Sequence, residues 1–222
     1  MMTPAHLTAG LGAIAVVLAA GLGVFVLAAN AQEAILAHSG HSVAVPDFDL
    51  AGFNFVGAML TYAILTGLNM KGKSLAGVNL SGANLKGADL TGIDLAGVNL
   101  KNANLKGADF RGANLTGAHL EGANLTGAHL EGANLTGAHL EGANLKGADL
   151  TGVNLAGVNL KNANLKAVNF AGVNLTSANL EGANLEGANL EGANLEGANL
   201  KGAVCPSGSR AQGQPAVCPD LG

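Results

Sequence analysis

The sequence between residues 83 and 203 repeats the pentad Ala-Asn/Asp-Leu-x-Gly almost without interruption, and residues 181–200 read EGANLEGANLEGANLEGANL. The register extends outward from this stretch, because a large apolar residue occupies every fifth position from Leu50 to Leu200. The residues other than Leu at these positions are Phe55, Met70, Phe110 and Phe170. A repeat this long predicts a repetitive architecture in which each unit packs on its neighbours.

A period of five residues fits neither regular secondary structure. On an α-helix, five residues advance about 500°, so successive leucines would not form one apolar stripe. On one straight strand, side chains alternate, so an odd spacing would place successive leucines on opposite faces. We therefore expect a solenoid whose chain runs extended for about three residues and then turns. The Leu and Ala of each pentad should point inward, Asn and x outward, and Gly should lie at the corner.

The motifs GANLKGADL, GANLTGAHL and EGANLEGANL resemble those of the pentapeptide-repeat proteins, over roughly two thirds of the chain. This resemblance implies an all-β fold, a right-handed, four-sided β-helix with four pentads, or twenty residues, in each coil. Residues twenty apart would then be stacked neighbours. The resemblance says little about function, because the family includes proteins that mimic DNA and protect topoisomerases and many others without a known activity.

The first segment, residues 1–31, is predicted to be an N-terminal hydrophobic helix, either a signal peptide or a membrane anchor. Residues 7–29 carry no charge and are rich in Ala, Gly, Val and Leu. Ala29-Asn30-Ala31 has the small-x-small form of a signal-peptidase site, which favours cleavage. The apolar length, however, approaches the ~20 residues of a spanning helix, which favours a retained anchor. We expect the rest of the chain to lie outside the cytoplasm, periplasmic, secreted or anchored in the membrane. No basic residue precedes Lys71, so the positive-inside rule gives no orientation for an anchor.

The remaining segments follow from the register. Residues 32–47 lack periodicity and are expected to be a linker, residues 48–203 form the β-helix, and residues 204–222 form a Cys-containing cap or tail. Cys205 and Cys218 enclose a short loop rich in Pro and Gly, which predicts a disulfide in an exported protein. Two free thiols in a cytoplasmic tail are the alternative.

Composition and motifs argue against an enzyme. Charged residues make up 12% of the chain, the net charge is −4, and the Gly count of 34 suits a repeat protein. No phosphate-binding loop, dinucleotide glycine pattern or Ser-His-Asp set occurs in the sequence, and a closely packed rod supplies no concave pocket. We therefore expect no catalytic residues, no cofactor and no small-molecule substrate. The weak net charge also indicates no nucleic-acid partner.

Three histidines lie in the tandem GAHLEGANLT units. If the coil has twenty residues, His119 and His139 stack on adjacent coils, and His129 lies between Asp109 and Asp149. Stacked His side chains, or His beside carboxylate, can bind a divalent metal. A flat exposed ladder offers no cavity and no supporting shell of hydrogen bonds, so the sequence alone assigns no metal site.

One outward column is nearly free of charge and is the candidate interaction face. Its members, spaced by twenty residues, are Ala76, Ala96, Thr116, Thr136, Ala156 and Thr176. Small side chains on a flat β-face allow close packing of a second surface, which predicts self-association or docking to a protein partner. Thr on a flat face also suits ordered water, so ice binding is a lesser alternative, against which Ala at half the positions argues.

These observations favour a non-catalytic structural or protein-interaction solenoid of the cell envelope. It would contact the membrane through its N-terminal helix if the leader is not cleaved. The alternative, suggested by the family resemblance, is a DNA-mimicking modulator of a topoisomerase. That function needs a cytoplasmic location and a strongly negative face, whereas the chain carries eleven basic residues against fifteen acidic ones.

Overall fold

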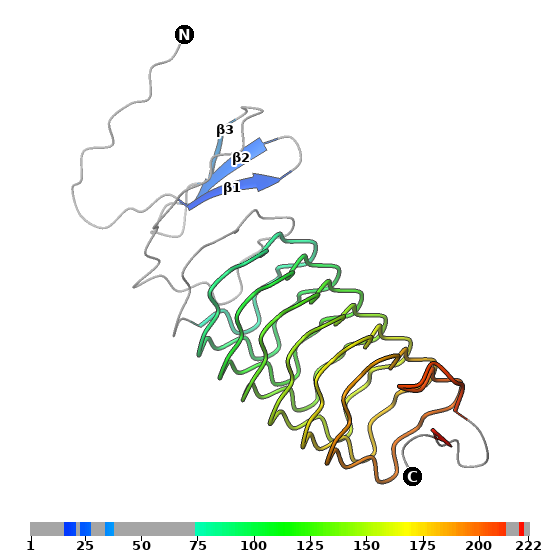
Figure 1. The fold of residues 1–222 in the computed structure, drawn as a ribbon. Coiled ribbons are helices and arrows are strands. Elements are labelled where there is room, and N and C mark those ends of the chain that lie inside the picture. The colour runs from blue at the N-terminus through cyan, green and yellow to red at the C-terminus, as the bar shows by residue number, and fades with distance from the viewer. Residues whose placement is uncertain (1–15, 21–22, 28–33, 38–73, 212–217, 220–222) are drawn as a thin grey trace. The chain divides into compact units, whose positions relative to one another are not determined.

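The structure, a computed structural model, describes residues 16–20, 23–27, 34–37, 74–211 and 218–219 (Figure 1). The chain divides into two compact units, Met1–Ala44 and Val45–Gly222. The expected start of the repeat at Phe48 lies outside the described residues, as does the linker except for residues 34–37.

The described part of the first unit is a small antiparallel sheet. It consists of β1 (Val16–Ala20), β2 (Gly23–Leu27) and β3 (Ala34–Ala37), in the order β1-β2-β3. Val16 pairs with Leu27 and Val24 pairs with Ala37. The helix predicted for this segment is therefore wrong for 16–20 and 23–27. The physical reason is composition, because β-branched and aromatic residues such as those of Val24-Phe25-Val26 favour strands.

Among the described residues, the structure contains no helix with the length and apolarity needed to span a membrane.

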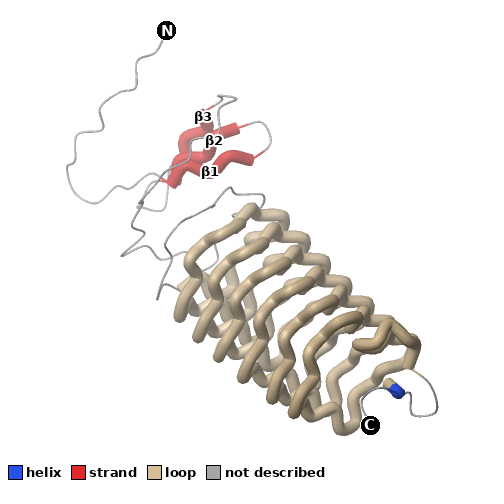
Figure 2. The backbone as a smooth tube through the Cα atoms, viewed as in Figure 1, coloured by secondary structure: helices blue, strands red, loops and turns tan. Residues whose placement is uncertain are grey.

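The second unit is a rod of stacked coils, seen from cyan to red in Figure 1. Parallel bridges join each Asn-position residue to the one twenty residues further on, from Ser74↔Asp94 to Asn184↔Val204. Four such positions occur in each coil, so the coil has four sides and twenty residues, as the family resemblance implies. Figure 2 draws the rod as loop, because each side contributes a single bridged residue rather than a strand.

The corners of the coil are tight turns. In the pentad around Gly122, the N–H of Ala123 donates to the carbonyl oxygen of Leu120 at 3.0 Å, and Gly122 has φ +67°. A hydrogen bond from residue i+3 to residue i, with positive φ at residue i+2, is the pattern of a type II β-turn, which favours Gly at i+2. Within residues 74–211, four non-glycine residues have a similar positive φ, between 56° and 58°: Asn102, Asn162, Ala167 and Ser177.

The core is a ladder of Leu and Ala, as the pentad predicts. Leu125 is 1% exposed and Ala123 is 0% exposed, and the described residues bury no polar or charged side chain. Phe110 and Phe170 lie on the same side of the rod, three coils apart, and are fully buried in place of Leu. Backbone bonds join the coils, for example from the N–H of Leu125 to the carbonyl oxygen of Asn144 at 2.7 Å.

The last coil extends beyond the boundary expected at residue 203. Val204 pairs in parallel with Asn184, and the N–H of Gly187 donates to the carbonyl oxygen of Pro206 at 2.8 Å. Cys205 occupies an inward Leu position and is 0% exposed. The coil continues here because an inward position requires only a small or medium apolar side chain, and Cys behaves as one.

After the coil, the chain reverses. Val204 pairs antiparallel with Arg210, and the N–H of Ala211 donates to the carbonyl oxygen of Ala203 at 3.0 Å. Cys205 is joined to Cys218 by a disulfide, with Cα atoms 5.5 Å apart. This cap covers the side of the last coil that contains Ala203 and Cys205.

Candidate interaction face

The six residues of the candidate face lie on one side of the rod, directly after the Leu of their pentads. Backbone bonds place successive members one coil apart. The N–H of Gly97 donates to the carbonyl oxygen of Thr116 at 2.8 Å, and that of Gly117 to Thr136 at 2.9 Å. We call this side the threonine wall. It consists of 74–76, 94–96, 114–116, 134–136, 154–156, 174–176 and 194–196.

The threonine hydroxyls of this wall are bonded within their own pentads. Thr116 Oγ1 donates to Asn114 Oδ1 at 2.7 Å, and Thr136 Oγ1 donates to Asn134 Oδ1 at 2.7 Å. Thr176 makes the same bond at 2.6 Å. The hydroxyl protons are therefore not available to order an external water lattice, which argues against the ice-binding alternative. These bonds already hold the threonine side chains in one conformation. A partner that binds the wall therefore immobilises few further side chains, so little conformational entropy is lost.

The Asn residues behind the threonines have a structural role that the sequence analysis missed. Asn114 Oδ1 accepts from the backbone N–H of Thr116 at 3.2 Å, which is an Asx turn, and its Nδ2 donates to Asp94 Oδ1 at 2.9 Å. Similar side-chain bonds join Asn104 to Asn84 and Asn164 to Asn144, each at 3.1 Å. The signal that could have predicted these turns is the Asn that recurs directly before the inward Leu of each pentad, two residues before the N–H that its side chain accepts.

The other three sides of the rod carry most of the charge of the described residues. The histidine wall contains His119, His139 and the outward residues Lys101, Glu121, Glu141, Lys161, Glu181 and Lys201. The lysine wall contains Lys86, Lys106, Lys146, Lys166 and Glu186. The aspartate wall contains Asp89, Asp109, Arg111, His129, Glu131, Asp149 and Glu191. Within 74–211, the threonine wall carries only Asp94 and Glu196, so it is the least charged side.

Ion pairs on the lysine and histidine walls run between coils. Lys166 Nζ lies 2.9 Å from Glu186 Oε1, and Lys101 Nζ lies 3.1 Å from Glu121 Oε1. Lys161 pairs with Glu181 at 3.3 Å. Lys86, Lys106 and Lys146, each at the start of a KGAD sequence, are exposed and form no ion pair with the described residues. These lysines leave the corner beside the aspartate wall positively charged.

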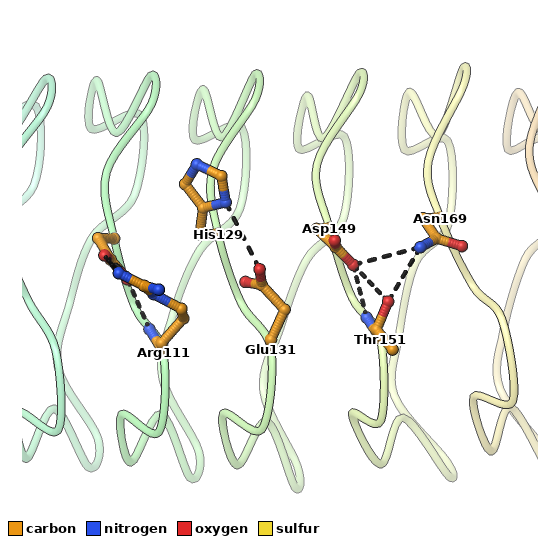
Figure 3. A network of polar contacts seen from close by, with 7 residues as sticks. Arg111, His129, Glu131, Asp149, Thr151 and Asn169 are labelled. Carbon is orange, nitrogen blue, oxygen red and sulfur yellow. Dashed lines mark hydrogen bonds and ion pairs between the residues drawn. The ribbon is translucent and has the colours of Figure 1, made fainter.

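On the aspartate wall, Asp109 is bonded by Arg111, whose Nε donates to Asp109 Oδ1 at 2.9 Å. This bond is the main reason that the pKa of Asp109 is lowered from its ordinary value. Figure 3 shows Asp149 bonded by Thr151 and by Asn169 of the next coil. The hydroxyl of Thr151, which donates at 2.6 Å, is the main cause that lowers the pKa of Asp149.

The predicted stacking of the histidines is confirmed. The backbone of His129 forms parallel β-bridges with Asp109 on one side and Asp149 on the other. The Nδ1 atom of His129 lies 3.6 Å from Glu131 Oε1 (Figure 3). His119 and His139 stack with ring centroids 5.0 Å apart and an angle of 6° between the rings. The three histidines have the same pentad sequence, so their different surroundings come from the neighbouring coils.

Comparison with known proteins gives consistent results. The sequence profile described as pentapeptide repeats matches residues 47–72, 74–112, 93–132, 113–152, 128–166 and 169–204, with 8 copies. No curated protein sequence is significantly similar to this chain.

Several solved structures are similar to this chain. HetL, a pentapeptide-repeat protein involved in the regulation of heterocyst differentiation in the cyanobacterium Nostoc, is 35% identical, with 69% of this chain and 85% of that chain covered and a TM-score of 0.45. A pentapeptide-repeat protein from the thylakoid lumen of Arabidopsis thaliana is 38% identical over 45% of this chain and 69% of that chain, with a TM-score of 0.44. QnrB1, a plasmid-mediated fluoroquinolone resistance protein, is 23% identical over 64% and 74%, with a TM-score of 0.46.

Proposed function

The chain belongs to the pentapeptide-repeat family, whose members form right-handed β-helices, and on that premise we propose that it is a non-catalytic interaction rod of the cell envelope. The rod self-associates through its threonine wall. The observation that carries this proposal is the combination of low charge and fixed side chains on that wall. The histidine, lysine and aspartate walls all carry long charged side chains, which must be desolvated or immobilised when another surface packs on them.

The occupant of the threonine wall is a second copy of this chain. Successive outward residues of the wall, such as Thr116 and Thr136, lie one coil apart, and a second rod presents small side chains at the same interval. Two such walls can therefore interdigitate along several coils, as packed sheets do. A globular partner without this repeat would match the wall at few positions.

Export from the cytoplasm is the second part of the proposal. The uncharged leader at 7–29 and the Cys205–Cys218 disulfide support it, because disulfides persist in oxidising compartments. Cell fractionation and sequencing of the mature N-terminus test this part. Recovery of the protein in the cytoplasm, with both thiols titratable after purification without reductant, would overturn it.

No observation favours the topoisomerase-modulating alternative. A DNA mimic needs a continuous negative surface, whereas the aspartate wall includes Arg111 and adjoins the exposed lysines of the lysine wall. The net charge of −4 is also small for such a role.

The test of self-association places charge on the threonine wall. In the variant Thr116→Lys/Thr136→Lys, two ammonium groups replace two small side chains, so the oligomer seen in sedimentation velocity should dissociate toward monomer. The control is Thr126→Lys/Thr151→Lys, which adds the same charge on the lysine and aspartate walls and should leave the oligomer intact. A wild-type monomer at all concentrations, or an oligomer that persists in the first variant, would refute the proposal.

A further inference from the structure

We propose that the histidine wall holds one divalent transition-metal ion of the zinc, copper and nickel class. The ligands are His119 and Glu121 from one coil and His139 and Glu141 from the next. This site lies on a different side of the rod from the threonine wall and does not depend on self-association.

The first observation is that the fold gathers four metal-ligating side chains from two coils. His119 and His139 are bridged neighbours with stacked rings. His119 Nδ1 lies 3.4 Å from Glu121 Oε1, and His139 Nδ1 lies 3.8 Å from Glu141 Oε1. The Nδ1 atom of each of the two imidazoles therefore lies near the carboxylate of its own pentad.

The second observation is the size of the cluster. One ligand atom from each of Glu121, His139 and Glu141 can be chosen so that all three lie within 4.8 Å of one another. Ligand atoms bind zinc at about 2.0–2.2 Å in a tetrahedral set, so any two of them are ~3.3–3.6 Å apart. Rotation of the exposed His139 and the half-buried glutamates would bring the cluster into this range. His119 supplies the fourth ligand of a tetrahedral set.

The third observation is that two carboxylate oxygens at the cluster have no hydrogen-bond partner. Lys101 and Asn159 contact the Oε1 atoms of Glu121 and Glu141, at 3.1 Å and 2.6 Å respectively. The Oε2 atom of each carboxylate is buried and unpaired. Two like-charged carboxylates on adjacent coils repel each other, and a shared cation relieves both the repulsion and the missing contacts.

The third GAHLE unit of this chain serves as an internal control. His129 and Glu131 have the same sequence context and the same Nδ1 to Oε1 arrangement, at 3.6 Å, and Glu131 Oε2 is also unpaired. The coils on either side of His129, however, present Asp109, which is bonded to Arg111, and Asp149, which is bonded to Thr151. Among the three GAHLE units, only the His119–His139 pair therefore brings two imidazoles and two glutamates together.

The donor set selects the metal. Two imidazole nitrogens with two carboxylates suit zinc, copper and nickel, whereas magnesium and calcium prefer sites made only of oxygen ligands. We therefore expect zinc to bind and magnesium not to compete with it.

The experiment is a zinc chloride titration of the full chain by isothermal calorimetry, in a buffer that does not chelate metal. The informative variants are His139→Asn and Glu141→Gln. Asn is the natural occupant of the His139 position in the next coil, at Asn159, so the first variant preserves the fold. The matched controls are His129→Asn and Glu131→Gln. His6, His38 and His41 are present in every variant, so their contribution cancels in each comparison.

Loss of one ligand should weaken zinc binding at least as much as loss of a supporting residue does, which is about 10–100-fold. We expect that effect in His139→Asn and Glu141→Gln and no change in the two controls. Histidine side-chain NMR signals should show zinc-dependent shifts for His119 and His139 together. Equal affinities in His139→Asn and His129→Asn, or the absence of zinc uptake by the wild-type chain, would overturn the proposal.

Discussion

The middle coils and the last coil of the rod are built from the same pentad but bury it to different degrees. Leu125 and Ala123 in the middle are 1% and 0% exposed. In the last coil, the inward residues Leu190, Ala193, Leu195 and Ala198 are all partly exposed. The terminal cap covers Ala203 and Cys205 of that coil but leaves these four residues less enclosed. In a solenoid, the burial of an inward residue is thus supplied largely by the coils above and below it.

The largest expected effect comes from a charge in the middle of the core. Leu125→Asp should destabilise the rod by more than ~4 kcal/mol, because an unpaired carboxylate would be buried between two coils. Leu195→Asp, the same change at a partly exposed inward position, should lose less, because its carboxylate remains in contact with water. Chemical denaturation followed by circular dichroism measures both. Equal losses would show that the two regions do not differ in burial.

An intermediate effect is expected from removal of the disulfide. The Cys205→Ala/Cys218→Ala variant removes the disulfide that joins two residues with a sequence separation of 13. In the chain-entropy model, a loop of this size contributes ~3 kcal/mol to the free energy of unfolding. The loss should be confined to the last coil, because each coil contacts only its neighbours. Hydrogen exchange should become faster at the amide of Leu185, which bonds to Val204, and stay unchanged at Leu125. Equal acceleration at both amides would contradict local coupling.

The smallest effect is the response of the middle coils to acid. The pKa values of Asp109 and Asp149 are lowered from the ordinary value of 3.8, so the folded state binds fewer protons than the unfolded state near that pH. The stability from these carboxylates is therefore complete above about pH 4 and is lost as the pH falls through the lowered values. The effect is small because the bonds to Arg111 and Thr151 lie at the surface.

Thermal melts of Asp109→Asn/Asp149→Asn between pH 7 and pH 2.5 measure this contribution. The difference in melting temperature between wild type and variant should shrink as the pH falls, because the wild type loses the advantage that the variant already lacks. A difference that stays constant down to pH 2.5 would show that these carboxylates do not contribute to acid sensitivity.

Much of the rod follows from local rules that a sequence displays directly. Leu and Ala alternate with outward residues, and Gly is favoured where φ is positive, so the inward ladder and most corners were predictable residue by residue. The coil of twenty residues was not contained in the pentad, because a five-residue side with a turn does not specify how many sides close a coil. That number came from the family resemblance, and the parallel bridges confirm it.

The errors lie where a short segment has more than one solution. The apolar leader suits a helix by length and strands by its Val and Phe content, and its described residues form β1 and β2. Cys205 has no Asn-Leu context, so it was predicted to lie outside the repeat, in the cap or tail at 204–222. Its inward position follows from pairing with the preceding coil, which local sequence does not encode.

By itself, the sequence determined which side chains face inward, which face outward and where the chain turns, because these properties depend on residues within one pentad. The tertiary structure alone decided which bonds the outward side chains form across coils. Identical GAHLE units became a two-imidazole, two-glutamate cluster at His119 and His139 and an isolated pair at His129. The bridged Asn of a side bonds an Asp of the neighbouring coil at Asn114 on the threonine wall and another Asn at Asn179 on the histidine wall. Such contacts depend on neighbours twenty residues away, and on side-chain conformations that only the packed coils select.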